Sequence, residues 1–303
     1  MNTIFASPIC QMEELKDIFI ELTAKNCNIR CRQCYINFPF NKNVKDFIKI
    51  DTIKKCLEDI KKENIRCIYL TGAEPMTHPD FNTILRLCIK KSDVCICTNA
   101  SFINEKKTRF LKNVENSSDH QIMFKLSFAH YDEIKNDNIR SRGAFRQNIY
   151  ALKCLEKYEF LSIITVSNYY NEPDELLISN FQDILSDINI DNAVIQITKW
   201  NGVNIGVNSG VNSGVNSGVN SGVDSRATKT EDLDITMDNT CLTDCSTSRT
   251  LTENGVFTCP FLANDYRGLS GVDFSNYSKT VRLETPFCET CIKNKDKMFT
   301  VEF

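Results

Sequence analysis

Histidine is the residue that this sequence lacks most plainly. The 303 residues include only three, His78, His120 and His130. This low number of histidines argues against mixed Cys/His zinc sites and against catalytic triads that use histidine. A catalytic or metal site in this chain has to be built mainly from other side chains.

The chain also lacks an excess of charge of either sign. It carries 36 basic and 39 acidic side chains, which gives a net charge of −3. A domain that binds nucleic acid is usually strongly basic. The balance argues against nucleic acid as a partner.

Long apolar runs are absent as well. No stretch reaches the ~18 apolar residues that a membrane-spanning helix needs. The N-terminal segment MNTIFASPICQMEELKD has no basic start and no apolar centre, so it does not resemble a secretory signal. We expect no membrane association and a location in the cytoplasm.

Cysteine, in contrast, is abundant. The chain has 15 cysteines, an odd number. In a reducing cytosol they are not a disulfide framework and indicate metal binding or catalysis. Five cysteines outside the two clusters described below fall on apolar faces of expected helices and strands, where a free cysteine packs as a small hydrophobe. They are Cys56, Cys67, Cys88, Cys95 and Cys97. Cys10 and Cys154 have no assigned role.

Strand-like and helix-like segments alternate over the first two thirds of the chain. The pattern predicts a parallel sheet with right-handed crossovers, in which ligands bind beyond the carboxyl ends of the strands. The expected strands are Asp17–Thr23, Ile65–Thr71, Val94–Thr98, Ile122–Phe128, Leu161–Val166 and Ala193–Thr198. The expected helices begin near Asp51, Phe81, Asn104, Phe145 and Glu172.

A low-complexity segment follows the last of these strands. Residues 201–225 contain tandem VNSG repeats, and valine at every fourth position is too sparse to form a core face. We expect a flexible surface loop there. It would divide the chain into a domain at 1–200 and a cysteine-rich region at 226–303.

Three cysteines lie close together directly after the first expected strand. The run NCNIRCRQCYI spaces Cys27, Cys31 and Cys34 as C-x3-C-x2-C. Thiolates are the usual ligands of iron–sulfur clusters, and a cluster with four irons held by three thiolates keeps one iron open for chemistry. The alternatives are a partial zinc site, although this loop has no histidine, and three unrelated thiols.

This loop resembles that of the radical S-adenosylmethionine superfamily, and the resemblance extends over about 200 residues. After the second expected strand, TGAEP at residues 71–75 is similar to the GGEP element of that family, with Ala73 in place of the second glycine. The resemblance implies that Gly72 and Ala73 offer backbone to the methionine part of the cofactor. It also implies that Glu74 accepts a hydrogen bond from the methionine amino group.

Weaker matches follow along the chain. Asn99 lies in a turn similar to the family's TNG element. Ser127 lies where the family places a hydroxyl near the nucleoside or the methionine carboxylate. Arg140 resembles the arginine that pairs with the methionine carboxylate, with Arg142 as a competitor. Gln33 occupies a position where the family usually has an aromatic residue or histidine against the adenine.

The resemblance implies a partial (βα)6 barrel of the TIM type with a small C-terminal cysteine-rich extension. It implies an enzyme that binds a [4Fe-4S] cluster and S-adenosyl-L-methionine and produces a 5′-deoxyadenosyl radical. A reducing partner such as a flavodoxin or ferredoxin would supply the electron. A metal-binding protein without catalysis and an enzyme that uses S-adenosylmethionine as a methyl donor remain alternatives.

The last part of the chain holds a second group of cysteines. ENG within CSTSRTLTENGVFTCP predicts a hairpin that brings Cys245 near Cys259, and Cys288-x2-Cys291 is a chelating pair. Together they resemble the twitch or SPASM extensions that hold an auxiliary cluster in this family. Zinc on the same four thiolates is the alternative, and Cys241 could replace Cys245. Extensions of this kind favour a peptide substrate, with a small molecule as the alternative.

Overall fold

The structure, a computed structural model, describes residues 9–36, 44–190, 192–198, 243–285, 287–288, 291–292 and 299–301. The expected repeat loop at residues 201–225, both of its limits and Cys241 lie outside the described residues.

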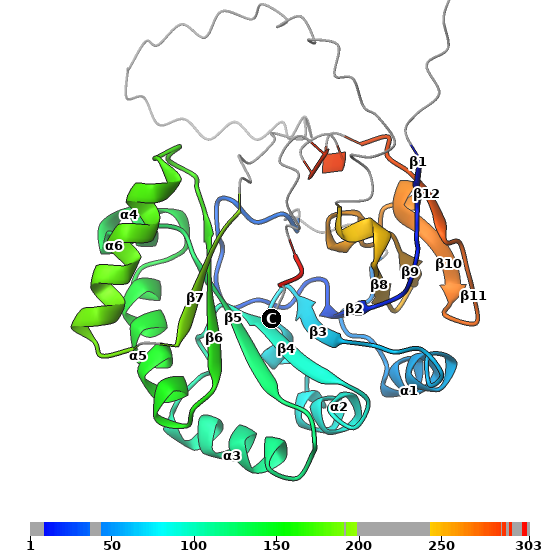
Figure 1. Ribbon diagram of the computed structural model, residues 1–303, viewed down its shortest axis with the longest axis horizontal. Helices are drawn as coiled ribbons and strands as arrows, with labels where there is room; N and C mark the ends of the chain where they lie inside the picture. Colours follow the sequence, from blue (N-terminus) through cyan, green and yellow to red (C-terminus); the bar gives the residue numbers. More distant parts are fainter. Residues whose placement is uncertain are drawn as a thin grey trace, which may run out of the picture.

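Six parallel strands follow one another to one end of a ten-stranded sheet (Figure 1). They lie in chain order, so each strand pairs with the one that follows it in this series. All six expected strands are therefore confirmed, with small shifts at their ends. They are β2 Asp17–Thr23, β3 Cys67–Gly72, β4 Asp93–Thr98, β5 Ile122–Phe128, β6 Leu161–Ser167 and β7 Ala193–Thr198.

Helices cover the convex face of this curved sheet and leave its concave face open toward the middle of the molecule (Figure 1). The five expected helices are present as α1 Ile50–Asp59, α2 Phe81–Cys88, α3 Glu105–Glu115, α5 Ala144–Lys157 and α6 Asp174–Asp187. Apolar side chains of both layers, such as Leu70, Leu85 and Phe124, form the main core. None of the described helices combines the length and apolar character needed to cross a membrane.

One helix lies where the sequence predicts only a polar loop. Helix α4, Glu133–Ile139, begins after Asp132, whose side chain accepts a hydrogen bond from Lys135 N at 2.9 Å. The buried Asn136 accepts a bond from Ala129 N at 2.9 Å and so ties the helix to the end of β5. Capping and one buried polar contact hold this short helix, which has too few apolar residues for a periodic pattern.

The C-terminal region continues the sheet on its other side. Strand β8, Ser248–Thr252, pairs in parallel with β2, and β9, Gly255–Phe257, pairs antiparallel with β8 as the expected hairpin. β10, Leu269–Asp273, and β11, Asn276–Tyr277, complete the order β11-β10-β9-β8-β2. Between its end strands β11 and β7 the sheet is open in the described residues, so the barrel is partial, as expected.

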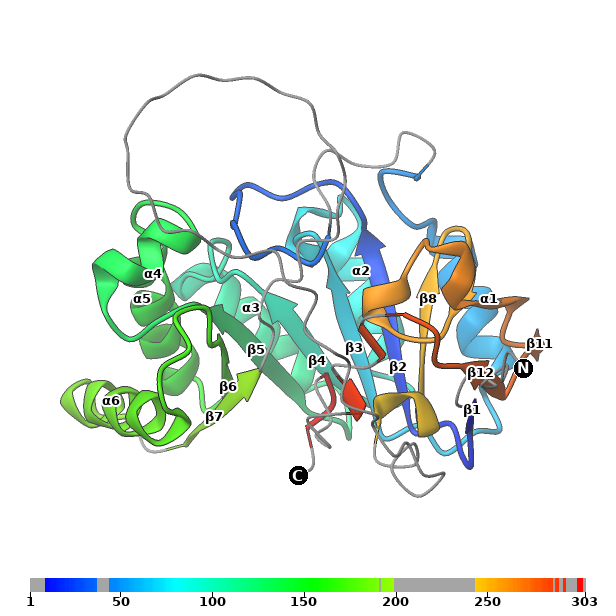
Figure 2. The ribbon, with the colours of Figure 1, turned by 90° about the horizontal axis from the view of Figure 1, so that it is seen from above.

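The two ends of the described chain also meet this region. β1, Ile9–Gln11, forms a separate two-stranded antiparallel sheet with β12, Thr280–Arg282 (Figure 2). Residues 299–301 return to the concave side of the sheet, where Lys125 Nζ donates to Phe299 O at 2.7 Å and Val301 N donates to Tyr69 Oη at 3.1 Å. The tail therefore fills part of the barrel interior.

Candidate functional site

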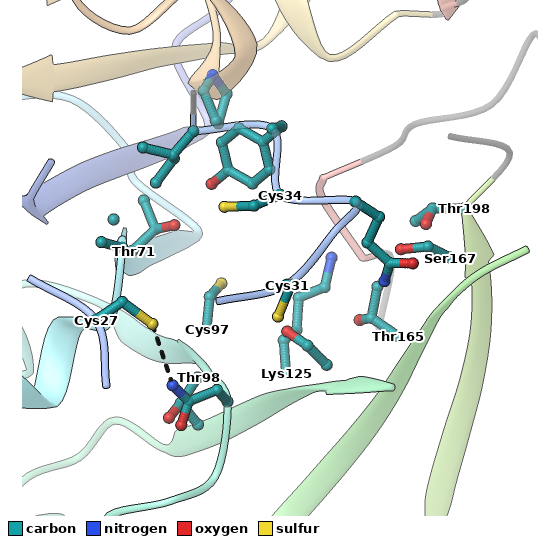
Figure 3. Close-up of a pocket in the computed structure, with 18 of the residues that line it drawn as sticks. Cys27, Cys31, Cys34, Thr71, Cys97, Thr98, Lys125, Thr165, Ser167 and Thr198 are labelled. Atoms are coloured by element: carbon teal, nitrogen blue, oxygen red, sulfur yellow. Dashed lines mark hydrogen bonds between the residues drawn. The ribbon is translucent and has the colours of Figure 1, made fainter. Parts of the chain in front are cut away.

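A large cavity opens at the carboxyl ends of the central strands, on the concave side of the sheet (Figure 3). Its empty volume is about 1170 Å³, including the part open to solvent. Nearly all residues that the sequence suggests for the first site line it. They are Cys27, Cys31, Gln33, Cys34, Gly72, Ala73, Asn99, Ser127 and Arg140.

The three clustered cysteines stand on a loop that is held from two sides. Arg32 N donates to Ile139 O at the end of α4, at 2.8 Å. On the other side, Asn99 Nδ2 donates to Cys27 Sγ at 3.5 Å (Figure 3). The loop is thereby fixed between α4 and the turn that follows β4.

Burial affects the acidity of these thiols. It raises the pKa of Cys34 to about 12 and also raises that of Cys27. Both thiols therefore keep their protons at neutral pH, and a metal that binds them must displace these protons. In the described part of the chain no three His, Cys, Asp or Glu side chains are gathered as ligands of a single metal ion. An iron–sulfur cluster is wider than one ion and is held by thiolates that stand further apart.

Gly72 lets β3 approach the end of β2 closely. Its φ is +126°, and a Cβ atom there would lie 2.3 Å from Thr23 O. Immediately beyond it, Ala73 N donates to Thr23 O at 2.7 Å and Glu74 N donates to Asn26 O at 3.0 Å. The first position of this turn thus requires glycine, whereas the second accepts alanine.

The carboxyl group of Glu74 does not line the cavity and makes its hydrogen bonds within the protein. Its expected contact with a methionine amino group stays a prediction. Glu74 is 0% exposed. Its Oε1 accepts hydrogen bonds from Thr98 Oγ1 at 2.8 Å and Met76 N at 3.2 Å, and its Oε2 accepts one from Asn99 N at 2.8 Å. Burial raises its pKa from an ordinary 4.5 to about 7. Glu74 therefore fixes the turn that carries Asn99.

Of the two competing arginines, only Arg140 lies at the cavity. It is buried, and its Nε has no hydrogen-bond partner among the described residues, whereas Arg142 is exposed. Gln33 Oε1 at the same cavity is likewise buried without a partner. Unpaired buried polar atoms are costly, so these two side chains fit a polar ligand, and the guanidinium fits a carboxylate.

Other polar residues at this cavity escape the sequence analysis. Lys125 and Cys97 are paired neighbours on β5 and β4 that both line the cavity, with Thr165, Ser167 and Thr198 across from them (Figure 3). A hydrogen bond from Cys95 lowers the pKa of Cys97, and the charge of Lys125 acts in the same direction. The prediction that Cys97 is only a core residue overlooks its place at the cavity. The sequence gives no sign of this place, because β4 is largely buried on both faces.

The four expected C-terminal cysteines also come together. Cys245, Cys259, Cys288 and Cys291 line a second, smaller cavity. Cys10 on β1 is fully buried in the same apolar cluster and acts electrostatically on Cys245. Its proximity depends on the pairing of β1 with β12, which the sequence does not reveal.

Aromatic side chains separate the two cavities. Phe261 and Phe299 line both of them. Their ring centroids are 4.5 Å apart, and Tyr35, next to Cys34, packs edge-on against both rings. The side chains that the two cavities share are therefore aromatic and apolar.

Comparisons with known proteins agree with this geometry. The family model described as "Radical SAM superfamily" matches residues 22–178, about half of the chain. Among curated proteins, the chain is 25% identical over 149 residues to the antilisterial bacteriocin subtilosin biosynthesis protein AlbA of Bacillus subtilis (strain 168). That match covers 48% of this chain and 32% of AlbA, so the chain spans about a third of that relative.

Solved structures show the same fold. The chain superposes on native anSMEcpe with bound AdoMet with a TM-score of 0.57 and 12% identity, covering 94% of this chain and 84% of that one. The structure of native anSMEcpe with bound AdoMet and the Cp18Cys peptide gives a TM-score of 0.56, 12% identity and the same coverage. At this level of identity the likeness concerns the fold.

Glu74 should make the stability of the protein fall as pH rises. Because its folded pKa is raised from 4.5 to about 7, its contribution is fully present below pH 4.5 and is lost as pH rises through about 7. A shift of this size corresponds to at most roughly 3 kcal/mol. In Glu74→Gln, the free energy of unfolding in urea should differ less between acid and neutral pH than it does in the parent protein.

Glu21 provides the matched control, since burial also raises its pKa to about 7 but its carboxyl group contacts Asn264 and not the turn after β4. Glu21→Gln should remove its own share of the pH dependence and leave the share of Glu74. A Glu74→Gln variant with the full pH dependence of the parent protein would contradict the assignment.

Proposed function

Because the chain belongs to the radical SAM superfamily, we propose that it is an enzyme that reductively cleaves S-adenosylmethionine to a 5′-deoxyadenosyl radical, which abstracts hydrogen from a substrate. Cys27, Cys31 and Cys34 would hold the [4Fe-4S] cluster. The observation that carries the proposal is that these three thiols line one cavity together with the unpaired Arg140 and Gln33. The cluster supplies one electron, and the protein binds and orients the cofactor.

Each cavity residue has a proposed task. The guanidinium of Arg140 holds the methionine carboxylate, and the backbone at Gly72 and Ala73 faces the methionine part. Ser127 and Gln33 provide polar contacts to the nucleoside. Asn99 donates to Cys27 Sγ and thereby orients this ligand. Glu74 would accept a hydrogen bond from the methionine amino group, and it also holds the turn that carries Asn99.

A second cluster is proposed for the C-terminal cavity, on Cys245, Cys259, Cys288 and Cys291. Its support is the convergence of four thiols on one small space. Zinc remains the alternative metal, and Cys241 remains an alternative ligand. We also propose that a first domain ends at residue 200 and that the cysteine-rich region begins at residue 226. We propose a cytoplasmic location, with a flavodoxin or ferredoxin as the electron donor.

For the substrate we propose a peptide modified after translation. AlbA, which resembles part of this chain, is named for the biosynthesis of a bacteriocin, and the anSMEcpe structure contains a bound peptide. The cavity is large enough for a side chain beside the cofactor. The hydroxyl groups of Thr165, Ser167 and Thr198 could form hydrogen bonds with the backbone of such a peptide. A small-molecule metabolite is the second candidate.

Replacement of Arg140 should weaken the binding of S-adenosylmethionine. Arg140→Gln removes a charge-assisted hydrogen bond worth about 1.5–3 kcal/mol, so the affinity should fall by roughly 10-fold to 150-fold. Isothermal titration of the anaerobically reconstituted protein measures this. The exposed Arg142→Gln is the matched control and should bind as the parent protein does. Equal affinities for S-adenosylmethionine in the two variants would refute the proposal that Arg140 binds the cofactor.

The cluster assignment is tested by replacing Cys27, Cys31 and Cys34 together with alanine. Reconstituted parent protein should contain about eight irons, the triple variant about four, and only the parent should release 5′-deoxyadenosine under reduction. Iron analysis and liquid chromatography measure the two quantities. Undiminished 5′-deoxyadenosine from the triple variant would refute the proposal, and zinc in place of the remaining iron would refute the second cluster.

The proposed substrate class predicts a change in the mass of a peptide. Short peptides encoded beside the gene should change mass after incubation with the enzyme, S-adenosylmethionine and a reductant, as measured by mass spectrometry. The triple variant provides the control. Unmodified peptides alongside active cofactor cleavage would favour the small-molecule alternative.

A further inference from the structure

A fully buried arginine lies beside the C-terminal cysteines. Arg249 on β8 is 0% exposed and is the bulkiest fully buried side chain among the described residues. All its hydrogen bonds go to backbone carbonyls: Nη1 donates to Cys245 O and Ser248 O at 2.7 Å, and Nη2 donates to Ser278 O and Lys279 O at 3.2 Å. The guanidinium therefore joins the turn at Cys245 to the start of β12.

These carbonyl groups satisfy donors but do not neutralise a charge. Within the described part of the chain, Arg249 forms no ion pair with a carboxylate, and its Nε has no hydrogen-bond partner. The ionisable groups that act on its charge are the thiols of Cys245, Cys10 and Cys259 and the phenol of Tyr277. A buried cation is costly unless an anion lies close to it. The hydrogen bond of Arg249 to Cys245 O places the guanidinium directly beside the proposed metal site.

We infer that Arg249 is the counter-charge of a thiolate-ligated metal centre on Cys245, Cys259, Cys288 and Cys291. Four thiolates bring four negative charges, and a divalent ion or a cluster core compensates only part of them. The guanidinium would offset part of the remaining negative charge and so stabilise the bound centre. This inference rests on the proposed C-terminal site. In the described structure these thiols are not gathered on a single ion, so Zn²⁺ would have to draw them together, whereas an iron–sulfur cluster spans a wider space.

The same charge would set the reduction potential if the centre is a cluster. Reduction adds a negative charge, and a buried cation nearby stabilises the reduced form. Arg249 is thus a positioning and charge-balancing residue that touches neither the substrate nor the radical cofactor. Its two roles can be separated, since lysine retains the charge but loses most of the hydrogen bonds.

The test uses the full chain with Cys27, Cys31 and Cys34 replaced by alanine, so that the C-terminal site is studied by itself. Zn²⁺ is the probe, titrated anaerobically into the metal-free protein against a chromophoric chelator. Arg249→Gln should weaken Zn²⁺ binding by about tenfold or more, and Arg249→Lys should stay within about threefold of the parent. Arg282→Gln, on the exposed face of β12, removes the same charge from the surface and should have no effect.

A second readout follows the iron form. After reconstitution with iron and sulfide, Arg249→Gln should have a more negative midpoint potential than the parent protein, whereas Arg249→Lys should not. If Arg249→Gln does not fold, the test rests on Arg249→Lys alone. A tenfold loss of Zn²⁺ affinity in Arg249→Lys would then overturn the inference. Unchanged Zn²⁺ affinity and potential in Arg249→Gln would also overturn it.

The outcomes separate this inference from the proposed function. If the site binds Zn²⁺ in a way that depends on Arg249 but takes up no iron, the proposed auxiliary cluster is refuted and the role of Arg249 as counter-charge is supported. If the site forms a cluster with the same midpoint reduction potential in all variants, the auxiliary cluster is supported and the proposed role of Arg249 is refuted.

Discussion

The buried carboxyl group of Glu74 is the contact on which the geometry of the large cavity depends. It binds the turn after β4 through Thr98 and Asn99, and its own backbone N–H binds Asn26 at the start of the cysteine loop. Asn99 in turn contacts Cys27 Sγ. This one residue, through its side chain and its backbone, thus connects two strand ends to the loop of thiols. Because these bonds lie away from water, each is strong and none is readily replaced by solvent.

The sequence predicts most of the barrel because each parallel strand is a short buried run followed by a helix with an apolar face. It fails where local pattern carries no information. Helix α4 depends on the cap at Asp132 and on the buried Asn136. The pairing of β8 with β2 joins residues more than 200 positions apart, and no local signal marks it.

The same distinction applies to the site. Cys27, Cys31 and Cys34 are recognisable because their spacing alone carries the chemistry, and Gly72 because its conformation requires glycine. Lys125 and Cys97 are hidden, since a strand buried on both faces gives no sign of which face meets a cavity. Cys10 and Arg249 acquire their neighbours only from the tertiary arrangement of the C-terminal strands.

The pairing of distant strands has a consequence for the order of events in the cell. β2 has β8 as its second neighbour, and β1 has β12 as its partner. Such contacts of high sequence separation form late and slow the folding of a chain. During synthesis, one edge of β2 stays unpaired until residue 252 has left the ribosome, an opening for wrong association. The second group of thiols likewise comes together only after Cys291 has been synthesised, long after the loop at Cys27, Cys31 and Cys34.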